Sequence, residues 1–181
     1  MVCSDCVKRE LGLVQVYTGD GKGKTTASLG LSFRAAGCGL NVLFLQFLKP
    51  AADCGEEFAA QRFDNITFLP LGEDHIYGNQ VSRAEDLDMA ARAFTQAKDL
   101  IYSGKYDLVV LDEINVAMAW DLLDPQQVIV MLKARPQHVE VVLTGRRCPQ
   151  AIMDYADLVT EMRLIKHPFD EGIAARRGIE Y

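Results

Sequence analysis

The sequence predicts an α/β fold of three layers, with helices on both faces of a mostly parallel central sheet. Short apolar runs rich in β-branched residues alternate with amphipathic stretches, the order that produces parallel strands joined by helices. The content of 49% hydrophobic and 24% charged residues is typical of globular domains. For 181 residues we expect one domain over residues 12–181, preceded by an N-terminal tail over residues 1–11.

The first part of the chain predicts three strands and one helix. The strands are short apolar runs at residues 13–18, 41–47 and 66–69. The helix is expected over Lys24–Ala36, because small and apolar residues recur on one face and Gly37 follows the last turn. Residues 70–82, which include Gly72 and Gly78, are expected to form a loop.

The second part predicts a long helix and three further strands. Leu87, Phe94 and Ile101 are spaced seven residues apart, with alanines between them. This spacing predicts a helix over Arg83–Tyr102 with that side buried. The expected strands cover residues 107–111, 139–143 and 159–165. Shorter helices are expected to begin at two prolines, since proline suits the first turn of a helix: Pro125 and Pro149.

Charge and apolar patterning narrow the class of partner and the compartment. The net charge of −6 argues against a nucleic-acid-binding surface. No apolar run approaches the roughly 18 residues of a membrane-spanning helix, and the N-terminus lacks the order of a signal peptide. Together with an odd number of cysteines, five, these features predict a cytoplasmic protein with reduced thiols.

The cysteines predict structural rather than chemical roles. Cys3 and Cys6 form one CxxC pair, which without a second pair is a weak zinc or redox signal. We interpret it as structural or incidental, with metal or redox use as the alternative. Cys38, Cys54 and Cys148 are isolated, and we expect them to be packing residues rather than nucleophiles.

A glycine-rich segment, GDGKGKTT at residues 19–26, lies between the first strand and the first helix. Its small residues let backbone amides surround phosphate oxygens, and the helix N-terminus adds partial positive charge, as in a P-loop. The match to GxxxxGK[ST] is not literal, because position 18 is Thr18 and the first glycine comes one residue later. We expect Lys24 to bind phosphates and Thr25 to bind Mg²⁺. The expected phosphate-binding residues are Gly19, Asp20, Gly21, Lys22, Gly23, Lys24, Thr25 and Thr26.

Two carboxylates follow the fourth predicted strand. The sequence YDLVVLDEIN, residues 106–115, places Asp112 and Glu113 at the carboxyl end of an apolar strand. Ligands of parallel sheets bind at this edge. One of the two carboxylates can hold Mg²⁺, directly or through water. An acid at the end of a buried strand is a moderate signal, and the glycine-rich segment strengthens it.

Arginines follow the fifth predicted strand. We expect Arg146 to contact phosphate, because a guanidinium at this sheet edge can form two parallel hydrogen bonds to it. A solvated surface pair with Arg147 is the alternative. Arg34, on the first helix, is expected to be a surface or structural residue. These residues predict Mg-nucleotide binding on an α/β scaffold, and they leave the reaction open.

Several segments resemble the P-loop type of corrinoid adenosyltransferase, which acts on cob(I)alamin or cob(I)yrinic acid a,c-diamide. They are GDGKGKTTA, VVLDE and LTGRRCPQAIMDYADLVTEMRLIKHPFDEGIAARRGIEY, and the resemblance runs from about Gly12 to Tyr181. It implies a P-loop NTPase-like (RecA-like) fold. It also implies that ATP donates its 5′-deoxyadenosyl group to the Co(I) of a corrinoid and leaves triphosphate, in adenosylcobalamin biosynthesis or salvage.

The same resemblance implies roles for individual residues. Residues 19–26 would bind the triphosphate, Thr25 and Glu113 would hold Mg²⁺ or Mn²⁺, and Asp112 is a further candidate ligand for the metal. The implied catalytic residues are Lys24, Thr25, Glu113 and Arg146. The family also implies a homodimer and a flavoprotein-type reductase as partner.

The loop after the third predicted strand departs from the family pattern. Many relatives carry an aromatic motif resembling TGFTW there, whereas residues 71–78 of this chain read LGEDHIYG. Tyr77 is a candidate to replace the missing rings beside the corrin. His75 is a candidate to approach cobalt, with a solvated side chain as the alternative. Trp120, the only tryptophan, cannot be placed on that motif.

Two other functions stay open at this point. One is a different P-loop enzyme, a small-molecule kinase or ATPase, which would release ADP. The other is a non-catalytic protein that binds ATP and a corrinoid without turnover. The phosphate product distinguishes these functions from the transferase.

Overall fold

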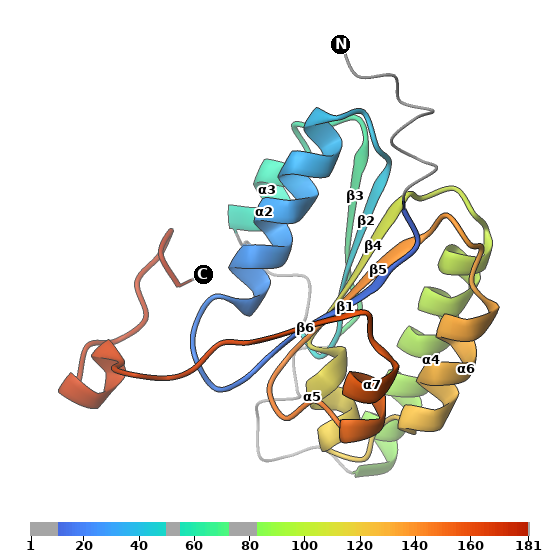
Figure 1. Cartoon of the computed structure of the whole chain (residues 1–181). Coiled ribbons are helices and arrows are strands. Elements are labelled where there is room, and N and C mark those ends of the chain that lie inside the picture. Colours follow the sequence, from blue (N-terminus) through green and yellow to red (C-terminus); the bar gives the residue numbers. More distant parts are fainter. Residues whose placement is uncertain (1–10, 50–54, 73–82, 181) are drawn as a thin grey trace.

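The computed structural model describes residues 11–49, 55–72 and 83–180. Figure 1 shows a central sheet between two layers of helices. The strand order is β3-β2-β4-β5-β1-β6, and each neighbouring pair is parallel. This architecture confirms the predicted three-layer α/β fold.

The strands are short, and those inside the sheet carry the most deeply buried residues. Their bounds are β1 Val14–Thr18, β2 Val42–Gln46, β3 Ile66–Pro70, β4 Leu108–Asp112, β5 Glu140–Thr144 and β6 Leu158–Glu161. The prediction of a last strand over residues 159–165 is wrong at its end, since β6 stops at Glu161. Beyond it the chain crosses the loop after β1, where the Met162 carbonyl accepts from Gly21 N at 2.7 Å.

Helices cover both faces of the sheet. On one face lie α2 (Lys24–Gly37) and α3 (Gly55–Ala60), and on the other lie α4 (Arg83–Tyr102), α5 (Ile114–Ala119), α6 (Pro125–Ala134) and α7 (Gln150–Tyr155) (Figure 1). A 3₁₀ turn follows at Pro168–Glu171. The sequence did not predict α3 and α5, because six residues are too few to display a helical period and neither helix follows a proline, as α7 does.

Alternating side chains of the buried strands build two hydrophobic cores. On β2, Leu43 and Leu45 pack with the core that contains α4 residues, whereas Val42 and Phe44 pack with the core that contains α2 residues. Successive side chains of a strand point to opposite faces, so one continuous apolar run supplies both cores. Phe44 stacks on Phe68 of β3, with ring centroids 5.1 Å apart.

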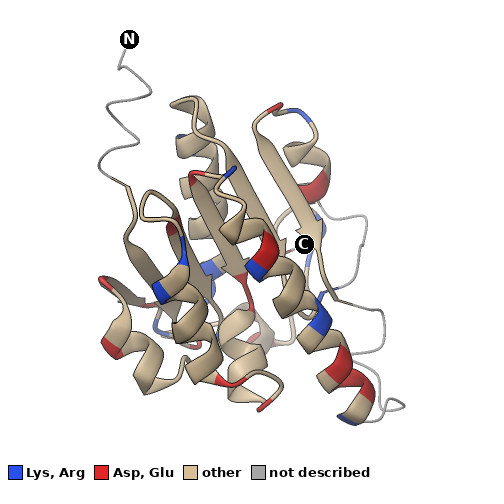
Figure 2. Ribbon diagram, turned by 90° about the vertical axis from the view of Figure 1, so that its right-hand side faces the viewer, with Lys and Arg blue, Asp and Glu red and all other residues tan. Residues whose placement is uncertain are grey.

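The long helix α4 confirms the predicted range and most of its buried side. Phe94 and Ile101 are 9% and 1% exposed. The prediction for Leu87 is wrong, because this residue is 39% exposed and burial along the helix begins only at Met89. Figure 2 shows charged residues along the outer side of this helix, as expected for an amphipathic helix on a sheet.

The two described thiols differ in burial. Cys148 is buried, as predicted for a packing residue. Cys38 is exposed, so the prediction that it packs in the interior is wrong; it caps the C-terminus of α2, outside the core. Cys3, Cys6 and Cys54 lie outside the described residues. Within the described ranges, no helix is long and apolar enough to cross a membrane.

Candidate active site

The carboxyl ends of four strands meet at one edge of the sheet. Asp112 at the end of β4 lies opposite Gln46 of β2, and Thr144 of β5 lies opposite Tyr17 of β1. A cavity of about 660 Å³ opens at this edge. Its lining includes the predicted catalytic residues Lys24, Thr25, Glu113 and Arg146. The structure therefore brings side chains from three separate segments together at one cavity.

The glycine-rich loop, residues 19–26, packs closely against the chain that follows β6. A Cβ atom at Gly21 would lie 2.7 Å from the carbonyl oxygens of Met162 and Arg163. Gly19 has φ +94°, and a Cβ added there would likewise collide with the Met162 backbone. Glycine is thus required here both for the conformation and for the close approach of two backbones.

Lys24, the first residue of α2, folds back onto this loop. Its Nζ donates to the carbonyl oxygens of Gly19 at 2.7 Å and Gly21 at 2.6 Å, and the residue is 7% exposed. Burial lowers the pKa of Lys24, and the charge of nearby Arg146 lowers it further. The ammonium therefore borders the cavity in a position where a phosphate would be a better partner than neutral carbonyl groups.

Asp112 is a fully buried carboxylate with four hydrogen-bond donors around it. Its Oδ1 accepts from Thr25 Oγ1 at 2.9 Å and from Thr144 Oγ1 at 2.6 Å. Its Oδ2 accepts from Gln46 Nε2 at 3.2 Å and from Lys49 Nζ at 3.3 Å. The four donors come from α2, β5, β2 and the residues after β2, so Asp112 ties these elements together.

Glu113 follows Asp112 with a left-handed backbone, φ 63°, and its side chain lines the cavity. Burial raises the pKa of Glu113, and the neighbouring charge of Asp112 raises it further. Three cations act in the opposite direction on this pKa: Lys49, Lys24 and Arg146. An additional cation next to Glu113 would relieve the same unfavourable charge.

The side chains at this point fit a hard divalent cation. The Thr25 hydroxyl donates its proton to Asp112, which leaves oxygen lone pairs for a ligand. Thr25 and Glu113 then offer the oxygen ligands that Mg²⁺ prefers, and Mg²⁺ fills its other positions with phosphate oxygens and water. Among the described residues there is no group of three or more His, Cys, Asp or Glu side chains that could hold a metal alone.

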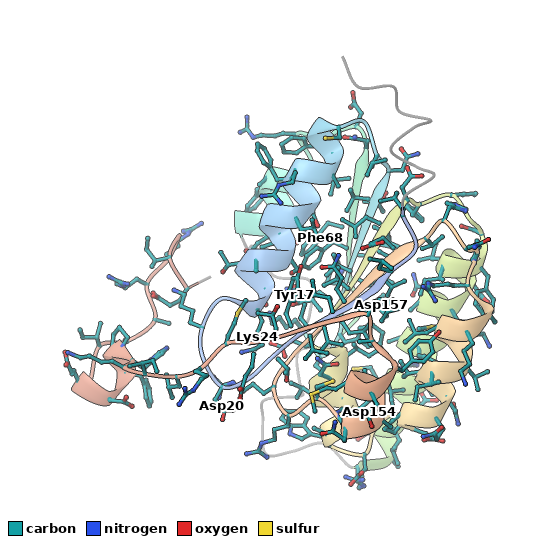
Figure 3. All side chains as sticks on the ribbon, viewed as in Figure 1. Tyr17, Asp20, Lys24, Phe68, Asp154 and Asp157 are labelled. Atoms are coloured by element: carbon teal, nitrogen blue, oxygen red, sulfur yellow. The ribbon has the colours of Figure 1, made fainter. Side chains whose placement is uncertain are left out.

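The loop residues predicted to bind phosphate are placed differently from one another. Gly21 to Thr26 line the cavity. Asp20 is exposed at the outer bend of the loop, whereas Lys24 lies close to the sheet (Figure 3). Lys22 borders the cavity, and its Nζ contacts Glu180 Oε1 at 2.9 Å and the Ile179 carbonyl at 3.0 Å.

The three arginines considered in the sequence occupy different positions. Arg146 lines the cavity, in the place expected after β5. Arg147 is exposed with φ 55°, and Arg34 is exposed on α2, as predicted for a surface residue. His75 and Tyr77, the candidates for corrinoid contact, lie outside the described residues.

Sequence reasoning missed three residues of this site. Gln46 and Lys49 contact Asp112, and His167 lines the cavity. A signal existed for two of them, because Gln46 interrupts an apolar strand and Lys49 follows the carboxyl end of that strand. His167 lies far along the chain, and only the path of the C-terminal segment brings it to the cavity.

One wall of the cavity is apolar. Its residues come from α2, β2, β3 and the turn before β3, and they are Leu29, Phe33, Phe44, Phe63, Ile66 and Phe68. The rest of the lining includes the glycine-rich loop and charged residues. The cavity can therefore receive a phosphate-bearing molecule together with an apolar surface.

Comparison with known proteins identifies the family. A family model described as ATP:corrinoid adenosyltransferase BtuR/CobO/CobP matches residues 10–181. A corrinoid adenosyltransferase of Sinorhizobium sp is 43% identical over 175 residues, which cover 95% of this chain and 81% of the relative. One of Pseudomonas aeruginosa is 38% identical, covering 95% of this chain and 85% of the relative. The corrinoid adenosyltransferase CobA of Salmonella typhimurium is also 38% identical, covering 96% and 88%. With a family match and relatives of this similarity over nearly its whole length, the chain belongs to the ATP:corrinoid adenosyltransferase family.

Proposed function

We propose that this protein transfers the 5′-deoxyadenosyl group of ATP to the Co(I) of a corrinoid. In this reaction the Co–C5′ bond forms, the C5′–O bond breaks, and the electron pair of that bond leaves with inorganic triphosphate. The observation that carries the proposal is the convergence of Lys24, Thr25, Glu113 and Arg146 on one cavity, in a chain of this family.

Charge neutralisation is the main task of the protein in such a reaction. The leaving triphosphate is more negative than bound ATP, and fixed cations stabilise the charge as it develops. We assign this role to Lys24 and Arg146, which line the cavity from different elements. Backbone amides of the glycine-rich loop hold the phosphates in place.

We assign Thr25 and Glu113 as the ligands of Mg²⁺ or Mn²⁺. Mg²⁺, when bound there, neutralises phosphate charge and fixes the orientation of the triphosphate. Asp112 is the less suitable ligand, since both of its oxygens already accept hydrogen bonds. We propose instead that Asp112 positions the Thr25 hydroxyl, from which it accepts a proton at 2.9 Å.

No side-chain nucleophile is needed, because Co(I) is itself the attacking atom. Cys148, the described thiol nearest in sequence to Arg146, is buried, and burial raises its pKa to about 12. It therefore stays a thiol at neutral pH and serves packing. The apolar wall with Phe33, Phe63 and Phe68 is the surface that we propose for the corrin macrocycle.

The assembly and the cellular context are also proposals. We propose a homodimer in the cytoplasm that receives its reduced corrinoid from a flavoprotein-type reductase. His75 and Tyr77 remain our candidates for corrinoid contact. Sedimentation equilibrium tests the assembly, and a monomer at all concentrations would rule the dimer out.

The experiment that tests the reaction is anaerobic. Cobalamin is reduced chemically to Co(I), protein and Mg-ATP are added, and the visible spectrum is followed while phosphate products are assayed. Loss of the Co(I) bands, a light-sensitive product and one triphosphate per corrinoid are expected. ATP cleaved to ADP, without adenosylation, would contradict the proposal and indicate a kinase or ATPase. ATP and corrinoid bound without turnover would indicate a carrier.

A further inference from the structure

We infer that Lys49 is a further triphosphate-binding cation of this transferase, in addition to Lys24 and Arg146. The inference rests on the proposed function, because it assigns the residue a role toward the leaving group of that reaction. It is carried by the backbone that fixes Lys49, by the charges around it and by its position in the cavity wall. Each is a separate observation.

The residue before Lys49 has a costly backbone conformation, which fixes the position of Lys49 at the cavity. The preceding residue, Leu48, has φ 60° although it is a bulky residue that is only 2% exposed. A left-handed bulky residue persists only where its surroundings impose it, and such residues cluster at functional sites. Gly72 supplies this constraint, because its N donates to the Lys49 carbonyl at 2.9 Å, and any Cβ on Gly72 would collide with the Lys49 backbone.

The side chain of Lys49 reaches the centre of the site. Its Nζ lies 3.3 Å from Asp112 Oδ2, and the side chain is 33% exposed and lines the cavity. Asp112 directly precedes Glu113, the proposed metal ligand, and both Lys49 and Glu113 line the cavity. Lys49 therefore lies in the same part of the cavity as the proposed metal and phosphate site.

Neutralising Asp112 alone does not account for this placement. Asp112 already accepts hydrogen bonds from Thr25, Thr144 and Gln46, and its contact with Lys49 is the longest of the four. Lysine carries a compact charge on a flexible stem, so its ammonium can exchange one anionic partner for another. A triphosphate in the adjoining cavity is such a partner.

The three cations would then enclose the triphosphate from three sides of the sheet edge. Lys24 belongs to the element after β1, Lys49 to the chain after β2, and Arg146 to the chain after β5. Negative charge grows on the triphosphate as the C5′–O bond breaks. Lys49 therefore stabilises the transition state more strongly than it stabilises bound ATP. It is thus expected to affect kcat more than the KM for ATP.

The test compares Lys49→Met with Lys49→Arg by calorimetric titration with inorganic triphosphate and, separately, with adenosine, in the presence of Mg²⁺. Loss of a charge-assisted contact predicts roughly 10- to 100-fold weaker triphosphate binding for Lys49→Met. Lys49→Arg retains most of the affinity, and adenosine binding does not change. Lys105→Met is the control, since Lys105 is an exposed lysine just before the amino end of β4, at the opposite sheet edge.

A second measurement separates direct binding from an effect through Asp112. Lys49→Met is combined with Asp112→Asn, and thermal melting checks that each variant is folded. A phosphate-binding Lys49 weakens triphosphate binding in both backgrounds. If the effect of Lys49→Met disappears with Asp112→Asn, or if Lys49→Met binds triphosphate as tightly as wild type, the inference is overturned. If Asp112→Asn does not fold, triphosphate affinity is measured against salt concentration in wild type and in Lys49→Met. Loss of a phosphate contact makes this dependence shallower in Lys49→Met, and an unchanged slope would overturn the inference.

These outcomes are distinct from failure of the proposed function. If wild-type protein does not adenosylate Co(I) corrinoid, the proposed function fails, whatever Lys49 does. If it does, and kcat and triphosphate affinity are unchanged in Lys49→Met, only the inference about Lys49 fails.

Discussion

Several charged side chains lie close together at the carboxyl edge of the sheet, and we assign most of the chemistry to them. Lys24 is the clearest case, because it is buried and is held by loop carbonyls rather than by an anion. We predict that Lys24→Ala lowers kcat by about 10²–10³-fold or more, the cost of losing one fixed charge at developing anionic density. Steady-state adenosylation at saturating ATP measures this. A rate close to wild type would count against the assignment.

Glu113 gives a prediction about the metal. We expect Glu113→Gln to weaken the response to Mg²⁺, because a neutral amide is a poorer ligand for a hard cation than a carboxylate. Titration of activity with Mg²⁺ at fixed ATP measures the shift toward higher concentration. An unchanged titration curve would move the ligand role to Asp112.

In metal-free protein, we expect the same substitution to raise stability. The folded pKa of Glu113 lies above its ordinary value of 4.5, so the folded state binds the proton more tightly than the unfolded state. Ionised Glu113 therefore lowers stability above its folded pKa, and this loss is recovered as pH falls through that pKa. We predict that Glu113→Gln unfolds at higher urea than wild type at pH 7 to 8 in EDTA. The difference should vanish below pH 4.5, and a constant difference across this range would contradict the prediction.

Elements are positioned at the site by backbone packing as much as by side chains. The glycine-rich loop contacts the chain after β6, where a Cβ on Gly21 would lie 2.7 Å from two carbonyl oxygens. We predict that Gly21→Ala lowers the free energy of unfolding by about 1–3 kcal/mol, the usual cost of overpacking. It should also weaken ATP binding, since the loop must move.

Gly30→Ala is the matched control for this prediction. Gly30 lies within α2, and a Cβ there would meet no atom within 4 Å outside the backbone of its own helix. Alanine there is expected to stabilise by about 0.5–1 kcal/mol, because glycine weakens a helix interior. If the backbone at Gly21 is closely packed, urea unfolding shows a lower free energy of unfolding for Gly21→Ala and a higher one for Gly30→Ala. Equal effects would indicate that the loop can shift freely.

How much of each element could be predicted depended on its length and its surroundings. The apolar run of β4 and the carboxylates that follow it indicated a strand with an acidic end, because both are local signals. Helices of six residues, α3 and α5, gave no period. The end of β6 could not be found locally either, since pairing with β1, and not composition, stops it at Glu161.

Ligand binding links the site to the stability of the complete protein. A ligand that binds only the folded state stabilises it by about 2.7 kcal/mol at 100 times its Kd. For a chain of this size that corresponds to a Tm increase of about 5–10 °C. We predict this increase with Mg-ATP in wild type and its loss in Lys24→Ala, measured by scanning calorimetry. An equal increase in both proteins would place ATP elsewhere.

Local patterns in the sequence already indicated the fold class, the glycine-rich loop and the acidic strand end. Apolar periods predict strands and helices, and the glycine-rich composition of residues 19–26 predicts a loop that can bind phosphate. These features depend on neighbours in the chain, so they can be read without knowing where distant residues lie.

The surroundings of those residues were settled by folding alone. Asp112 meets Gln46 and Lys49 because β2 pairs beside β4, and 63 residues separate Lys49 from its carboxylate partner. His167 reaches the cavity through a C-terminal segment whose path follows from packing on the loop. Contacts between distant residues depend on strand order and on backbone approach, and no local period encodes either of them.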